Sequence, residues 1–183
     1  MSGRDLLHSS AQQLASVRSS HPDGALRVLL PIASLHSGAG DAPLGSDILR
    51  VEAAASGIRA ELNAAIPEVA SWWTTPTLWL GPSANASGAH TPPGEAYLSL
   101  EGFHQVVSDT ISSLLGWADQ VIVVSTADDR EALSPILRSL RTAGAHVVWV
   151  AIEHGPEATF QAVDALRFSE PGDDGYLEAH SEQ

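Results

Sequence analysis

The sequence predicts an α/β protein, a three-layer α/β/α sandwich built on a mainly parallel sheet. Two observations support this class. Apolar runs at residues 26–32, 121–124 and 146–152 have the composition of strands that are covered on both faces. Amphipathic stretches with helical spacing separate these runs. Strands that alternate with helices form parallel sheets with helices on both faces, because the crossover connections are right-handed.

The composition fits a single soluble globular domain and excludes several classes of function. The chain has 183 residues, of which 44% are hydrophobic, so it can bury a proper core. Its net charge of −13 argues against binding to nucleic acids or anionic membranes, which need a positive surface. The chain has no Lys and no Cys, which excludes a Schiff-base lysine, a P-loop lysine, disulfides and thiolate chemistry. No apolar run is long enough for a signal peptide or a membrane span, so we expect a cytoplasmic protein.

Residues 1–24 form a predicted N-terminal helical extension. Residues 6–17 have a weakly amphipathic helical pattern, and this helix could pack on the body of the protein or on a partner. A turn cluster at residues 19–24 ends it. The strand at residues 26–32 then opens the main domain, which we place at residues 25–168.

A loop rich in Gly and Pro connects this first strand to a long helix. Apolar residues repeat at helical spacing over residues 48–66, so the helix has one buried face. Either Ser46 or Asp47 is expected to be its N-cap, and Pro67 ends it.

The rest of the chain continues the alternation of strands and helices. A predicted strand at residues 72–80 leads into a polar loop at residues 81–95, and loops of this length in compact domains are usually functional or mobile. The elements that follow are a helix from Ser99 to about Gly116, a strand at residues 120–125, a helix at residues 131–143, a strand at residues 146–152 and a helix at residues 157–166. Gly144 is a plausible C′ residue. The acidic tail at residues 169–183 is expected to lack fixed structure.

Potential metal ligands gather in the loop between the first strand and its helix. His36, Asp41 and Asp47 all lie within residues 29–47. In open α/β sheets, sites lie outside the carboxyl ends of the strands. Imidazole and carboxylate groups are suitable ligands for divalent metals, so this loop is the first candidate for a site.

Residues 33–47 resemble the first motif of the creatininase family, whose members are metal-dependent amidohydrolases. That motif reads Gly-Ser-(Leu/Ile)-Glu-Gln-His-Gly-Pro-His-Leu-Pro-Leu-Gly-Thr-Asp, and it aligns with this chain without a gap. The matching residues are Ser34, Leu35, Pro43, Leu44, Gly45 and Asp47. His36 stands at the position of a metal-binding Glu, Gly38 at that of a metal-binding His, and Asp41 at that of a second His. Asp47 matches the ligand that bridges the two metal ions.

A later strand end resembles the family's Asn-Gly-His motif more loosely. Residues 125–130 occupy its place, but Ala127 replaces the metal-binding His. Asp129 falls where some members supply a ligand Glu. Residues 153–159 resemble, at a spacing one residue short, the family's late His-Ala-Gly motif.

The resemblance implies a metal site at the carboxyl edge of the sheet. The candidate ligands are His36, Asp41, Asp47 and Asp129, and the metal would be zinc, manganese or iron. A carboxylate shared between two ions keeps them close enough to polarise a carbonyl and activate a water together. Three protein ligands with an open position would also suffice for one catalytic zinc.

Other interpretations of the same residues remain open. His90 and Glu95, in the long loop, either bind substrate or act as acid and base, or they are solvated loop residues. Structural roles also explain the candidate ligands: Asp47 would be a helix N-cap, Asp129 would cap the helix that follows it, and His36 would be an ordinary loop histidine.

Two hypotheses about function follow. The first is a divergent creatininase-like amidohydrolase that opens a cyclic amide or cleaves another C–N bond of a small-molecule amide. The second is a catalytically inactive creatininase-fold protein that serves as a structural or regulatory partner subunit. The losses at Gly38 and Ala127 favour the second hypothesis. The retention of Asp47 and the potential replacement ligands His36 and Asp41 favour the first. A binding module for a sugar or nucleotide that uses the loop at residues 81–95 is a third alternative.

The resemblance also implies assembly, either into a homo-oligomer or with a related subunit. Trp72, Trp73 and Trp79 are assigned to the core or to subunit contacts rather than to a substrate box. The sequence has neither a Gly-x-Ser-x-Gly elbow nor a Gly-x-Gly-x-x-Gly fingerprint, so serine hydrolase and dinucleotide-binding functions have little support.

Overall fold

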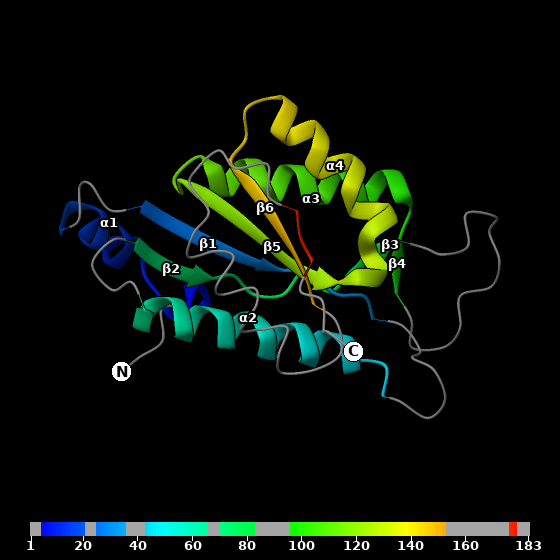
Figure 1. Cartoon of the computed structure of the whole chain (residues 1–183), viewed down its shortest axis with the longest axis horizontal. Helices are drawn as coiled ribbons and strands as arrows, with labels where there is room; N and C mark the ends of the chain where they lie inside the picture. The colour runs from blue at the N-terminus through cyan, green and yellow to red at the C-terminus, as the bar shows by residue number, and fades with distance from the viewer. Residues whose placement is uncertain are drawn as a thin grey trace.

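A five-stranded parallel sheet forms the centre of the structure (Figure 1). The computed structural model describes residues 5–20, 25–35, 43–65, 70–82, 96–152 and 176–178. The strands are β1 (Ala25–Pro31), β2 (Ala70–Thr74), β5 (Gln120–Thr126), β6 (Val147–Ile152) and β7 (Tyr176–Glu178). Their order in the sheet is β2-β1-β5-β6-β7, and each neighbouring pair is parallel. The predicted parallel sheet is therefore confirmed.

Helices cover both faces of this sheet, which confirms the three-layer arrangement. Figure 1 shows α2 (Ser46–Ala65) on one side, and α3 (Leu100–Leu115) and α4 (Arg130–Thr142) on the other. Strand β1 contributes to both layers, because Leu29 belongs to the core cluster under α2 and Leu30 to the cluster under α3 and α4. The helical residues buried in these clusters are Val51, Ala55, Ile58 and Leu62 of α2, Phe103, Val107 and Ile111 of α3, and Ala132, Leu133, Ile136 and Leu137 of α4.

The predicted ends of α3 and α4 are also confirmed. The hydroxyl of Ser99 accepts a hydrogen bond from the backbone N–H of Gly102 at 3.0 Å, which caps the first turn of α3. Gly144 follows the C-cap of α4 with a φ of 88°, a conformation that favours glycine.

The N-terminal helix is shorter than predicted. Instead of one helix over residues 6–17, the chain forms a 3-10 turn, η1 (Leu6–His8), and then α1 (Ala11–Ser20). Ser10 and Gln13 form a reciprocal capping box: the Ser10 N–H donates to Oε1 of Gln13 at 2.6 Å, and the Gln13 N–H donates to Oγ of Ser10 at 3.2 Å. This pair fixes the start of α1. Of the two predicted locations, packing on the body is the one observed.

Side chains of the N-terminal segment pack against residues of β1 and β2. A third core cluster contains Leu26, Val28, Trp73 and Ala118, with Leu6, Leu14 and Val17 packed against it. The guanidinium of Arg18 adds a hydrogen bond to the carbonyl of Trp117 and a 3.3 Å contact to the Asp119 carboxylate. Residues 5–20 of the predicted extension are therefore part of the folded body.

The strand predicted at residues 72–80 lies earlier in the chain, at β2. After Thr74 the chain leaves the ladder in a segment that contains Pro76, which lacks the N–H that a continuing strand needs. It then forms β3 (Gly81–Pro82), which pairs in parallel with β4 (Tyr97–Leu98). The predicted loop at residues 81–95 thus begins inside a strand, and residues 83–95 lie outside the described part of the chain.

The prediction that the tail at residues 169–183 lacks fixed structure is wrong for β7. This strand pairs in parallel with β6, with Trp149 opposite Tyr176 and Ala151 opposite Glu178. Without it, one edge of β6 would present a row of unpaired N–H and C=O groups. The helix predicted at residues 157–166 lies outside the described residues.

An Arg is buried near the amino end of β1. Arg27 is only 8% exposed, and its guanidinium lies 4.7 Å from the ring centroid of Trp72. Its Nε and the Oε1 of the register neighbour Gln120 are buried without hydrogen-bond partners. Burial lowers the pKa of Arg27, and the charge of Asp119 opposes this shift. The charged side chain therefore costs stability here.

We expect Arg27→Met to raise the free energy of unfolding by about 1 kcal/mol, since a buried charge without an ion pair is replaced by an apolar side chain of similar length. Because burial lowers the pKa of Arg27, the charged side chain destabilises the folded state fully at neutral pH, and this cost falls only as the pH rises through that pKa. The stability gained in Arg27→Met should therefore be constant around neutral pH. Urea unfolding at several pH values measures it. Arg138→Met, at an exposed position of α4, is the matched control and should change stability by less than about 0.5 kcal/mol. A clear loss of stability in Arg27→Met would show that the contact with Trp72 outweighs the desolvation of the charge.

Candidate functional site

The carboxyl end of β1 is held in place by two segments that follow it in sequence. The N–H of Leu78 donates to the carbonyl of Pro31 at 2.9 Å, and the N–H of Ala33 donates to the carbonyl of Leu78 at 3.0 Å. Further along, Leu35 and Ala96 form an antiparallel bridge. The backbone is therefore fixed up to the residue before His36, where the candidate site was predicted.

Asp47 lies at this edge, in the first turn of α2. Its Oδ1 is 2.9 Å from Nη2 of Arg50, and the two side chains are 21% and 29% exposed respectively. Neither Asp47 nor Ser46 is the N-cap of α2, which corrects that prediction. The Gly45 carbonyl accepts the first helical hydrogen bond, from the N–H of Leu49, so Gly45 occupies the cap position. The carboxylate of Asp47 is therefore more than two-thirds buried, close to the positive end of the helix dipole and paired with an Arg.

Asp129 lies at the carboxyl end of β5. It belongs to the 3-10 turn η2 (Ala127–Asp129) and is followed by α4. It occupies the N-cap position of α4, but its side chain makes no capping hydrogen bond, so the capping role considered for it is not observed. Its Oδ2 instead accepts a hydrogen bond from the hydroxyl of Thr126 at 3.2 Å. Ala127, at the position of the family's His, packs against the core cluster under α3 and α4.

Asp47 and Asp129 therefore lie at the same edge of the sheet, but Asp47 belongs to the helical layer on one face and Asp129 to the layer on the other face. In Figure 1 the strands β1 and β5 point toward the end of the sheet where both α2 and α4 begin. Four further candidates lie outside the described residues: His36, Asp41, His90 and Glu95.

The donor set of a metal site is incomplete within the described part of the chain. No group of three His, Asp or Glu side chains that could hold a metal ion occurs among residues 5–20, 25–35, 43–65, 70–82, 96–152 and 176–178. The carboxylates of Asp47 and Asp129 are hard oxygen donors of the kind that manganese or zinc accepts. Further donors would have to come from residues 36–42, which contain His36 and Asp41.

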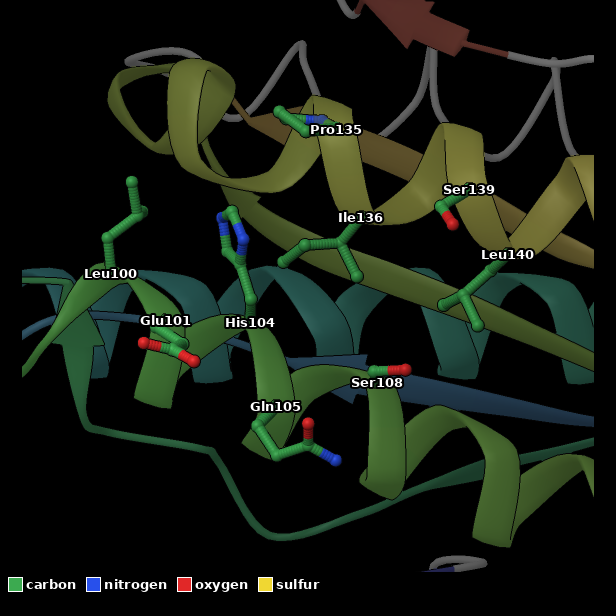
Figure 2. Close-up of a pocket in the computed structure, with 9 residues that line it drawn as sticks. All are labelled: Leu100, Glu101, His104, Gln105, Ser108, Pro135, Ile136, Ser139 and Leu140. Atoms are coloured by element: carbon green, nitrogen blue, oxygen red, sulfur yellow. The ribbon is translucent and has the colours of Figure 1, made fainter.

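The structure also contains a pocket that the sequence did not predict. It has a volume of about 490 Å³ and lies between α3 and α4 on the outside of the sandwich (Figure 2). The residues that line it are Leu100, Glu101, His104, Gln105, Ser108, Pro135, Ile136, Ser139 and Leu140. Side chains spaced four residues apart on α3 face the pocket. This stripe of mixed polarity does not predict a pocket from the sequence alone, because the sequence does not show which helix faces it.

His104 is the central polar group of this pocket. Figure 2 shows its ring directed from α3 toward α4. Its Nε2 is 3.1 Å from the carbonyl oxygen of Ala132, so Nε2–H donates to that carbonyl. This bond ties α3 to α4 and gives His104 a structural role.

The assignment of tryptophans to the core is confirmed for Trp72 and Trp73 but not for Trp79. Trp72 is fully buried, and Trp73 is nearly so. Trp79 is 47% exposed.

In the described part of the chain, no helix is both long enough and apolar enough to cross a membrane.

Comparisons with known proteins identify the fold. No protein-family model and no curated protein sequence matches the chain. Solved structures do match. A creatinine amidohydrolase (creatininase) is 19% identical, with a TM-score of 0.59 over 82% of this chain and 58% of the other. A creatininase described as the Mn form is 19% identical, with a TM-score of 0.57 over 81% and 58%. A Bacteroides fragilis protein assigned as a creatinine amidohydrolase is 13% identical, with a TM-score of 0.63 over 82% and 57%.

These similarities agree with the motif at residues 33–47. The chain spans less than three fifths of the length of these three neighbours. At such identities the comparison establishes the architecture and not the activity. The chain has a creatininase-like α/β fold.

Proposed function

We propose that this chain is a divergent metal-dependent hydrolase of the creatininase type, acting on a cyclic amide or another C–N bond of a small molecule. The observation that carries the proposal is the place of Asp47, a largely buried carboxylate in the first turn of the helix that begins at the carboxyl edge of the sheet. That edge is where sites form in parallel α/β folds. The fold shared with a creatinine amidohydrolase and with a manganese form of creatininase supports the same chemistry.

In this proposal Asp47 and Asp129 supply carboxylates, and His36 and Asp41 supply the remaining donors. A metal bound there would polarise the substrate carbonyl and acidify a water molecule. The chain's own contacts orient the carboxylates. Arg50 fixes the rotamer of Asp47 through the 2.9 Å contact, and the Thr126 hydroxyl fixes Asp129. His90 and Glu95 are proposed to bind substrate or to move protons.

A second candidate function is a catalytically inactive partner subunit with the same fold. Two observations favour it. Gly38 and Ala127 cannot coordinate a metal through their side chains, and Ala127 packs against the core. The carboxylate of Asp47 already has a cationic partner. In this role the chain would assemble with copies of itself or with a related subunit.

Metal analysis of the purified protein separates the two candidates. We expect about one equivalent of zinc, manganese or iron in protein prepared without chelator, and none above background in Asp47→Ala, because this variant lacks the central carboxylate. Asp109→Ala, which removes an exposed carboxylate of α3, is the charge-matched control and should retain the metal. Metal that is present in the wild-type protein and lost in Asp47→Ala would justify assays for hydrolysis of lactams and cyclic ureas.

The opposite result would favour the partner subunit. If the wild-type protein and Asp47→Ala contain the same background level of metal, the hydrolase proposal fails. Size-exclusion chromatography with light scattering would then report whether the chain assembles with itself.

A further inference from the structure

Arg50 lies one helical turn after Asp47 and contacts its carboxylate. The pair is separated by three residues in α2, a spacing that places two side chains next to each other on the same helix face. The Nη2 to Oδ1 distance of 2.9 Å is that of a charge-assisted hydrogen bond. Both side chains are more than two-thirds buried, so solvent screens this contact less than it would an exposed pair.

The guanidinium of Arg50 makes this contact a pairing of opposite charges. A guanidinium group carries a positive charge, and this charge faces the carboxylate. The first turn of α2 adds the partial positive charge of the helix N-terminus. The negative charge of Asp47 is therefore already compensated by groups of its own helix.

A divalent cation at Asp47 would meet two obstacles. It would have to share or replace the hydrogen bond from Arg50, and it would be repelled by the guanidinium at short range. The carboxylate of Asp129 accepts a hydrogen bond from a neutral group, the hydroxyl of Thr126. A neutral donor orients a carboxylate without opposing a cation.

We infer that Arg50 is the resident counter-cation of Asp47 and that it competes with divalent metal for this carboxylate. The inference rests on the proposed function, since it concerns the same site. Arg50 is a positioning residue that acts through Asp47 and lowers the metal affinity of the site.

Equilibrium metal binding to the full chain tests this inference. Zn²⁺ or Mn²⁺ is titrated into chelator-treated protein in a calorimeter, and the shift of the melting temperature with added metal is a second readout. Removal of a unit charge close to a divalent ion predicts that Arg50→Gln binds on the order of tenfold more tightly than wild type. Arg59→Gln removes the same charge from the same helix, two and a half turns further from the edge, and should bind as wild type does.

A conservative variant separates charge from shape. Arg50→Lys keeps the positive charge and should also match wild type. If Arg50→Gln does not fold, as judged by circular dichroism, Arg50→Met keeps the apolar stem and takes its place.

The outcomes distinguish this inference from the proposed function. Tighter binding in Arg50→Gln supports the inference, whether wild type binds metal weakly or not at all, although a wild type without metal contradicts the proposed function. Equal, measurable binding in wild type and Arg50→Gln overturns the inference and leaves the proposed function standing. The absence of binding in both overturns both.

Discussion

Trp72→Ala should lower the free energy of unfolding by about 3–5 kcal/mol, the range for removing a large aromatic side chain from a core. Trp72 is fully buried on β2 and belongs to the core cluster under α2, which also contains Leu29, Leu62 and Ile122. The substitution opens a cavity against helix α2, whose position is set by this packing. Part of the loss comes from the guanidinium of Arg27, which would remain buried without the aromatic ring that it contacts.

Two further variants separate packing from the Arg27 contact. Trp72→Phe keeps an aromatic ring and removes the indole N–H, which is buried without a hydrogen-bond partner, so its cost should be well below that of Trp72→Ala. In an Arg27→Met background, Trp72→Ala should be less destabilising than in wild type, because no charge is left exposed to the cavity. The difference is the coupling energy of the pair.

Urea denaturation followed by circular dichroism measures these changes. Trp79→Ala is the matched control, because Trp79 is 47% exposed and its removal should cost less than about 1 kcal/mol. If Trp72→Ala and Trp79→Ala were equally mild, the assignment of Trp72 to the core would be wrong.

Gly81→Ala should lower the free energy of unfolding by about 1–3 kcal/mol through overpacking. A Cβ at this position would overlap Oγ of Ser34 and lie 2.6 Å from its Cβ and 3.3 Å from its Cα. Rotation of the Ser34 hydroxyl cannot relieve the last two contacts. The cost therefore reflects how closely β3 passes the segment that leaves β1 toward the candidate site.

A compensating substitution tests this explanation. Ser34→Gly removes the atoms that collide, so the double variant with Gly81→Ala should recover most of the lost stability in a thermal or urea melt. Gly45→Ala, where an added Cβ meets nothing within 4 Å, is the control and should cost about 1 kcal/mol or less. A double variant no more stable than Gly81→Ala alone would mean that the clash with Ser34 is not the cause.

Strong periodic signals made the fold predictable. Four elements lie nearly where the sequence predicted them: the buried strands β5 and β6 and the helices α3 and α4. A long apolar run or an amphipathic helical pattern is compatible with few other structures. The errors fall on short elements. Strand β7 has three residues, and its stability comes from the exposed edge of β6, which only the assembled sheet provides.

The candidate site was less predictable for a different physical reason. The motif predicted a site at the carboxyl edge of the sheet, and Asp47 lies at that edge, in the first turn of α2. What the motif did not reveal is the partner of Asp47. Arg50 was visible in the sequence, but an Arg three residues after an Asp is common on solvated helix faces, so only burial and distance distinguish a fixed pair.

The position of β1 inside the sheet has a consequence for how the chain folds. Its two neighbours are β2, which follows soon after it, and β5, which is so distant that the contact between Leu26 and Asp119 joins residues 93 apart. Closing such a loop costs entropy before any pairing is gained, and chains dominated by distant contacts fold slowly. We therefore expect the docking of β5 against β1 to limit the folding rate. Until β5 has been synthesised, one edge of β1 in the growing chain has no strand to pair with.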